Sequence, residues 1–67
     1  MTTTFAERLK NAMEQANMSQ SALSEQAGAS KAAISQYLSG KNTPGPDRIK
    51  ALADATGVSF DYLMGYG

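Results

Sequence analysis

The residues that enzymes use most often for nucleophilic and acid–base chemistry are scarce in this sequence. It contains no histidine and no cysteine, which excludes the usual nucleophile–base pairs and the common zinc-ligand sets. The six Asp and Glu residues are scattered, with no evident pair. Gly28, Gly40, Gly45 and Gly57 separate amphipathic segments rather than form a phosphate-binding loop. We therefore expect no catalytic activity, no cofactor and no bound metal.

Uncharged hydrogen-bonding groups are concentrated in residues 28–40, GASKAAISQYLSG, whose pattern predicts a short helix between two glycines. Ile34, Tyr37 and Leu38 recur at the spacing of one apolar helical face. The opposite face carries small or uncharged side chains, namely Ala32, Ser35, Gln36 and Ser39. Because surface helices are usually covered in charge, this bare face indicates a contact surface.

Charge is balanced overall but unevenly distributed. The net charge is zero, from six Lys and Arg against six Asp and Glu residues. Taken alone, this argues against nucleic-acid binding, because nucleic-acid-binding domains are usually basic. However, no acidic residue lies between Glu25 and Asp47, whereas Lys31 and Lys41 both do. The uncharged helix face therefore lies in a segment without negative charge.

The bare face belongs to one of five predicted helices, each marked by local end signals. Thr4 and Glu7 form a capping box for the first helix, which should stop near Asn17. Ser19 should cap a second helix at about 20–27, and Ser30 a third at about 31–39. These two helices should end at glycines 28 and 40.

The C-terminal third should contain two more helices. Gly45 and Pro46 are a plausible N-cap and N1 pair for a fourth helix that ends at Gly57. A last helix follows Ser59. No segment alternates with a period of two, so we expect an all-α fold. Its core should include Phe5, Leu9, Ile34, Leu52 and Leu63.

The chain length allows one small domain, spanning residues 1–67. The absence of cysteine fits a reducing cytosol. No apolar run approaches the ~20 residues that a membrane span needs, and no signal-peptide pattern is present. We therefore expect a soluble, cytoplasmic protein.

The second and third predicted helices are separated only by Gly28, Ala29 and Ser30. A turn this short that contains glycine sets two helices roughly at right angles, as in a helix-turn-helix. Small residues should lie where the helices cross, and Ala22, Ala27 and Ala33 are available there.

Residues along nearly the whole chain, from about 5 to 64, match the pattern of one family. They are Ser19, Gln20, Leu23, Ala27, Gly28, Ser30, Ile34, the LSGK run at 38–41, Pro44, Leu52, Ala53, the GVS run at 57–59 and the DYL run at 61–63. With them the sequence resembles the helix-turn-helix domains of lambdoid phage repressor, Cro and xenobiotic-response-element type. The resemblance implies a five-helix DNA-binding domain of a transcriptional regulator, such as a repressor, encoded by a bacterium or phage. Its partner would be double-stranded DNA, with the third helix in the major groove.

The resemblance gives the bare face a role in reading bases. Gln36 can make two hydrogen bonds with adenine, and the Ala32 methyl can contact that of thymine. Ser35 can contact several bases. Lys31 could reach either a guanine or a phosphate, and the sequence leaves both open. We therefore expect Lys31, Ala32, Ser35 and Gln36 to read bases.

The same resemblance implies a second set of residues that hold the DNA backbone. Gln20 matches a family glutamine that contacts phosphate beside a helix N-terminus. Ser30 would both cap its helix and touch the backbone. Lys41 and Asn42 match a loop that grips the sugar-phosphate chain in relatives. Such contacts fix the register without reading sequence.

Three departures from the family pattern stand out. Asn42 and Thr43 are neutral where many relatives carry basic residues, which lowers the expected affinity. Met13 and Leu38 stand where some relatives have an Arg–Glu ion pair, and an apolar contact there leaves the fold intact. Pro46 replaces a usual core leucine, so the fourth helix should begin differently.

The family binds pseudo-palindromic operators as dimers, which implies a homodimer on DNA. The predicted dimer surface is the C-terminal end, where Phe60, Tyr62, Met64 and Tyr66 supply apolar groups. The end at Gly67 would suit an isolated N-terminal domain. The alternative is a helical protein–protein interaction module, antitoxin-like or degenerate, that keeps the fold without specific DNA binding. The zero net charge favours that alternative.

Overall fold

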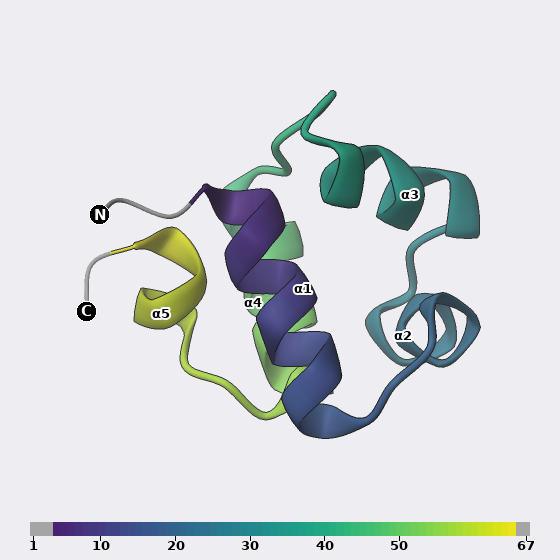
Figure 1. Ribbon diagram of the computed structural model, residues 1–67, viewed down its shortest axis with the longest axis horizontal. Helices are drawn as coiled ribbons and strands as arrows, with labels where there is room; N and C mark the ends of the chain where they lie inside the picture. The colour runs from purple at the N-terminus through teal and green to yellow at the C-terminus, as the bar shows by residue number, and fades with distance from the viewer. Residues whose placement is uncertain (1–3, 66–67) are drawn as a thin grey trace.

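The computed structural model describes residues 4–65, and within them the chain forms only helices. These are α1 (Phe5–Ala16), α2 (Gln20–Ala27), α3 (Lys31–Ser39), α4 (Pro46–Thr56) and α5 (Phe60–Met64), arranged as in Figure 1. The all-α, five-helix expectation is confirmed.

Four of the helices begin with a hydroxyl side chain that caps the backbone. Thr4, Ser19, Ser30 and Ser59 each accept a hydrogen bond from the N–H three residues on, at 3.0–3.2 Å. The fourth helix begins instead at Gly45 and Pro46, with no side-chain cap. At the other ends, Asn17 adopts φ 56° and the predicted glycines also lie in the left-handed region. The predicted helix ends are thus confirmed, and of the capping box the structure shows the bond from the Glu7 N–H to the Thr4 hydroxyl.

The core receives one large, fully buried side chain from each helix: Leu9, Leu23, Ile34, Leu52 and Leu63. Phe5, which the sequence pattern assigns to the core, is only half-buried. Its ring lies edge-on to that of Tyr37, with centroids 6.4 Å apart. Phe5 stands at the first position of α1 and packs, partly buried, against the core. It therefore closes the edge of the core together with Tyr37.

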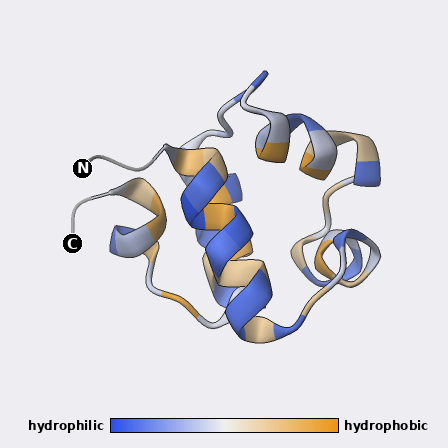
Figure 2. Cartoon of the chain, viewed as in Figure 1, coloured by the Kyte–Doolittle hydropathy of each residue, from blue (hydrophilic) through white to orange (hydrophobic). Residues whose placement is uncertain are grey.

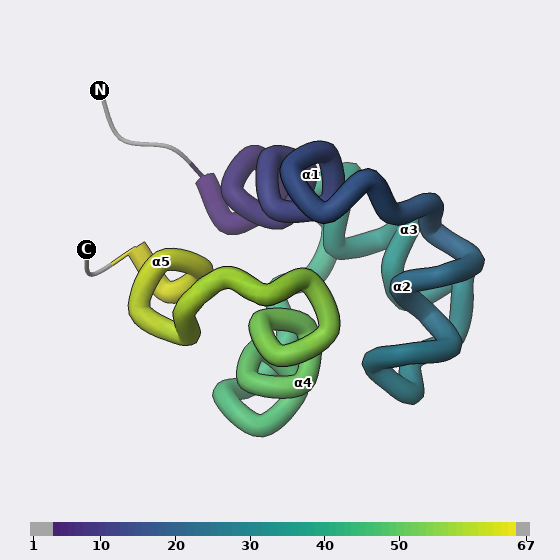
Figure 3. Tube along the Cα trace, turned by 90° about the horizontal axis from the view of Figure 1, so that it is seen from below, coloured from purple at the N-terminus to yellow at the C-terminus, as the bar shows by residue number. Residues whose placement is uncertain are grey.

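The helix-turn-helix occupies one end of the molecule. In Figure 1, α2 is seen almost end-on while α3 lies across the view, so the two helices cross at a steep angle as predicted. Figures 1 and 3 both place α5 at the opposite end of the longest axis from α2 and α3. Figure 2 shows the hydrophobic positions of α3 turned toward the other helices. In the described part of the chain, no helix is long and apolar enough to cross a membrane.

Two arginines cap helix C-termini from distant positions, which the sequence analysis did not predict. Arg48 Nη1 donates to the carbonyls of Ala27 at 3.4 Å and Gly28 at 3.1 Å, at the end of α2. Arg8 Nε donates to the carbonyl of Leu63 at 3.1 Å, near the end of α5. A cation stabilises a helix C-terminus because the last carbonyls have no partner within the helix. Both side chains are thus used to hold the fold.

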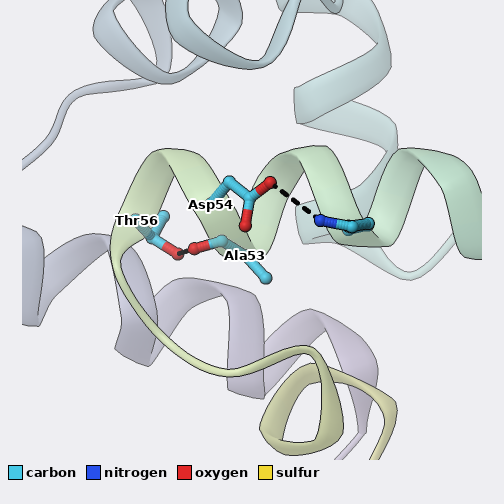
Figure 4. Close-up of polar contacts among 4 residues, drawn as sticks. Ala53, Asp54 and Thr56 are labelled. Carbon is cyan, nitrogen blue, oxygen red and sulfur yellow. Dashed lines mark hydrogen bonds and ion pairs between the residues drawn. The ribbon is translucent and has the colours of Figure 1, made fainter.

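Helix α4 carries two polar interactions that differ in their contribution to stability (Figure 4). The buried Thr56 hydroxyl donates to the carbonyls of Leu52 at 2.9 Å and Ala53 at 3.3 Å, so its burial leaves no orphaned donor. Lys50 and Asp54 form an ion pair at 3.3 Å, but their side chains are 70% and 72% exposed. An exposed pair of this kind contributes little to stability. Thr56 is therefore the more important of the two for α4.

Candidate nucleic-acid interface

The outer face of α3 is built from the residues predicted to read bases. Lys31, Ala32, Ser35 and Gln36 are all exposed, whereas Ile34 is fully buried. At 3.6 residues per turn, these four side chains fall within an arc of about 140° around the helix axis. Ile34 anchors the opposite side, so α3 presents a continuous polar face to solvent.

The turn between α2 and α3 sets the direction of that face. Gly28 adopts φ 70°, and the Ala29 N–H returns to the carbonyl of Ser24 at 3.1 Å. Arg48 ties the same turn to α4. The Ser30 hydroxyl accepts from the N–H of Ala33 at 3.0 Å, which starts α3 while leaving Ser30 exposed. Three interactions therefore fix the turn: the Ala29 backbone bond, the Arg48 side chain and the Ser30 cap.

Gly40 turns the chain back along the end of α3. With φ 82°, it lets the Lys41 N–H reach the carbonyl of Gln36 at 3.1 Å, which is the bond of a Schellman motif that spans the larger number of residues. The Ser39 hydroxyl donates to the same carbonyl at 3.0 Å. Lys41 and Asn42 consequently lie beside the last turn of α3, and both are exposed.

The returning loop brings two predicted site residues into contact. Asn42 Nδ2 donates a hydrogen bond to Gln36 Oε1. From the sequence, Gln36 is predicted to read bases and Asn42 to contact phosphate; the pairing of their side chains is a finding of the structure. The signal available was the Gly-Lys-Asn run after the helix. A Schellman turn brings the chain after the glycine back to the last turn of the helix, where Gln36 lies.

Gln20 lies apart from this pair, at the first position of α2. It is exposed beside the free N–H groups of the helix start. Lys10 of α1 lines the same shallow groove of about 410 Å³. Lys10 is not among the predicted site residues, because a lysine in the middle of an amphipathic helix gives no signal for a site.

The same groove contains Met13 and Leu38, the two apolar residues that stand where some relatives have an Arg–Glu ion pair. Met13, Met18 and Leu38 line it together. Met13 is 7% exposed, and Leu38 is half-buried against the core. The two positions therefore share one apolar surface between α1 and α3, as expected.

An acidic side chain from another helix lies close to the segment between Glu25 and Asp47, although that segment itself contains no acidic residue. Glu7 of α1 lines a groove of about 530 Å³ together with Asn42 and Thr43. The interface thus combines the cations Lys31 and Lys41 with a carboxylate near the loop that follows α3. A sequence window cannot detect this, because Glu7 comes from another helix.

The fold and the exposed polar helix define a helix-turn-helix protein. A model of the helix-turn-helix family matches residues 9–63. Because this match covers most of the chain, the protein belongs to the helix-turn-helix family, a class whose second motif helix reads the DNA major groove.

Two solved structures support the expected likeness to lambdoid repressors. The DNA-binding domain of the P22 c2 repressor, determined by NMR in solution, is 31% identical with TM-score 0.91, over 97% of this chain and 86% of that one. The crystal structure of the P22 c2 repressor in complex with a synthetic operator is 30% identical with TM-score 0.88, over 98% of this chain and 100% of that one. Among curated protein sequences, none matches this chain.

Proposed function

We propose that this protein is a sequence-specific transcriptional repressor that binds double-stranded DNA with α3 in the major groove. The observation that carries the proposal is the exposed outer face of α3, on which Ala32, Ser35 and Gln36 are uncharged and Lys31 is the one charged side chain. Small side chains let the helix backbone approach the base edges. A side-chain amide can then form two hydrogen bonds with groups on a single base edge. The P22 c2 repressor, similar over the whole chain, was crystallised with an operator.

Four side chains are assigned to reading bases. Gln36 pairs with the N7 and N6 groups of adenine, and Ala32 packs against a thymine methyl. Ser35 and Lys31 complete the face at the centre and the start of α3. Their exposure along one arc supports this assignment.

Contacts that hold the DNA backbone flank the base-reading face. We assign them to Gln20 at the start of α2, Ser30 at the turn and Lys41 after α3. All three side chains are exposed, whereas Asn42 beside them is paired with Gln36. Lys41 is the only one of them that carries a charge. The proposed role is one of binding, and we assign no catalytic step.

The proposed functional unit is a homodimer on a pseudo-palindromic operator. The described part of one copy measures 29 × 23 × 21 Å. Recognition helices in adjacent half-sites lie about 34 Å apart, a spacing that accommodates two copies of this size side by side. Phe60, Tyr62 and Met64 are half-buried and offer apolar surface for that contact; Tyr66 lies outside the described residues. Such a regulator would act in the cytoplasm of a bacterium.

The test is binding to duplexes selected from a random pool, at ~50 and ~200 mM salt. We expect enriched duplexes to bind more tightly than scrambled ones, and Gln36→Ala to cost roughly 1–3 kcal/mol on the enriched site. Gln26→Ala, which removes an exposed glutamine from α2, is the matched control and should leave binding unchanged. No enrichment and no retardation of any duplex by folded protein would refute the proposal.

A second candidate function is a protein–protein interaction module. It is favoured by the zero net charge and by the groove in which Met13, Met18 and Leu38 lie beside the polar side chains of Lys10, Glu14 and Gln20. The same experiment separates the two functions, because such a module would bind no duplex even at low salt.

A further inference from the structure

The hydrogen bond between Asn42 and Gln36 determines which edge of the Gln36 amide is free. A glutamine side chain has an acceptor oxygen and an NH₂ donor, and an isolated amide can present either one to DNA. Here Oε1 accepts from Asn42 Nδ2, so one of its two lone pairs is occupied. The other lone pair and both Nε2 protons stay available.

The free groups match one base edge. In the major groove, adenine presents N7 as an acceptor and N6 as a donor. Nε2–H can donate to N7 while the second lone pair of Oε1 accepts from N6–H. If the Gln36 amide alone were rotated by half a turn, Nε2 would meet Asn42 Nδ2, donor against donor, and the hydrogen bond would form again only if Asn42 also turned its Oδ1 toward Gln36. The pairing thus opposes rotation of the Gln36 amide by itself.

We propose that Asn42 is a positioning residue for sequence reading, which fixes the Gln36 amide in the orientation that selects adenine. This inference rests on the proposed function, because it presumes that α3 enters the major groove. It changes the role of Asn42 from a backbone contact to a determinant of specificity that acts through Gln36.

Two features of the structure favour this role over a phosphate contact. The Schellman turn at Gly40 directs the loop back to Gln36, and the Asn42 amide is already engaged there before DNA arrives. Glu7 lines the same groove as Asn42, and its carboxylate would repel a phosphate drawn to that site. An interaction between two neutral amides carries no such penalty.

The experiment compares two duplexes that differ only in the base pair read by Gln36, adenine against guanine. A complete glutamine–adenine contact is worth a preference of roughly 5- to 150-fold. We expect Asn42→Ala to reduce the wild-type preference by roughly three- to tenfold while affinity for the guanine duplex and the salt slope stay unchanged. In a Gln36→Ala background, Asn42→Ala should have no further effect.

Lys41→Ala provides the matched control from the same loop. It should weaken both duplexes by the same factor and so leave the preference unchanged. If Asn42→Ala behaved like Lys41→Ala, lowering both affinities and the salt slope, Asn42 would be a phosphate contact and the inference would be wrong.

Asn42→Asp tests the direction of the hydrogen bond. An aspartate at this position can only accept, so it would draw Nε2 of Gln36 toward itself and turn Oε1 to the DNA. The adenine preference should fall below that of Asn42→Ala, whatever the added charge does to overall affinity. A preference equal to that of wild type would overturn the inference.

A measurement on the free protein separates this inference from the proposed function. Side-chain ¹⁵N relaxation of the Gln36 amide should report slower motion in wild type than in Asn42→Ala, with Gln26 as an internal reference. Equal mobility in both proteins would show that the pairing does not order Gln36. Absence of DNA binding with the ordering intact would instead refute the proposed function, and the role of Asn42 in sequence reading with it, while the pairing of Asn42 with Gln36 would stand.

Discussion

Arg48 Nη1 donates to the carbonyl of Gly28 at 3.1 Å, and so joins α4 to the turn between α2 and α3. The two residues are 20 positions apart in the sequence. The bond satisfies a carbonyl next to the end of α2 and places a positive charge where the helix macrodipole is negative. The orientation of α3 therefore depends on a side chain outside the helix-turn-helix.

Replacement of Arg48 should loosen this corner. We expect Arg48→Ala to lower the free energy of unfolding by about 1 kcal/mol, since the contact is partly exposed. In a domain of this size that corresponds to roughly 4–8 °C in the melting temperature. Arg48→Lys, which keeps the charge but not the planar donor group, should lose less. Thermal denaturation of the three proteins measures both effects, and equal melting temperatures would show that the contact is energetically silent.

A capping side chain is missing at one helix start, and adding one should stabilise the protein. Gly45 has φ −73° and ψ 172°, close to the values at Ser19 and Ser30, and a Cβ there meets nothing within 4 Å. Gly45→Ser should raise the free energy of unfolding by about 0.5–1 kcal/mol through the cap and the stiffer unfolded chain. Gly40→Ser is the contrasting variant, because φ 82° strains any side chain. Urea unfolding should move the two midpoints in opposite directions.

The apolar surface shared by Met13 and Leu38 predicts a coupled pair. Leu38→Glu puts an unpaired carboxylate against nearly buried Met13 and should cost about 2 kcal/mol. Met13→Arg added to it should recover part of that loss by forming an ion pair. A double-mutant cycle of unfolding free energies measures the coupling. Strictly additive effects would mean that the two side chains do not interact.

Few cations lie at the proposed interface, so binding should depend only moderately on salt. With Lys41 neutralising one phosphate and Lys31 reading a base, log K against log salt should fall with a slope of about −0.9 per monomer; a slope of about −2 would place Lys31 on a phosphate as well. Lys41→Ala should reduce that slope by about 0.9. Affinity titrations at several salt concentrations test this. A slope near zero would eliminate the phosphate contacts.

The dimer proposal predicts the stoichiometry on DNA. We expect a monomer or weak dimer in free solution and two copies on a palindromic duplex with half-sites about one helical turn apart. Inserting ~5 bp between the half-sites turns them to opposite faces and should abolish paired binding. Sedimentation of the protein with each duplex measures this, and one copy per unaltered palindrome at saturation would contradict it.

Local signals in the sequence were sufficient to predict the helices and most of the core. Ser19 and Ser30 cap through the N–H three residues on, and Gly40 ends α3 because its φ is positive. Each of these interactions is complete within a few residues, so it can be read from the chain alone. The outward face of α3 was predictable for the same reason, since its 3.6-residue period separates Gln36 from buried Ile34.

Only the tertiary structure decided what surrounds that face. Arg8 and Arg48 form their capping bonds across 55 and 20 residues, and nothing in the local pattern of either arginine indicates its partner. Glu7 approaches Asn42 because α1 packs beside α3, although the sequence around Asn42 contains no acid. The pairing of Asn42 with Gln36 likewise depends on the path of the chain after Gly40. Residue types and helical period are properties of the chain, whereas partners arise only when packing brings separate segments within hydrogen-bonding distance.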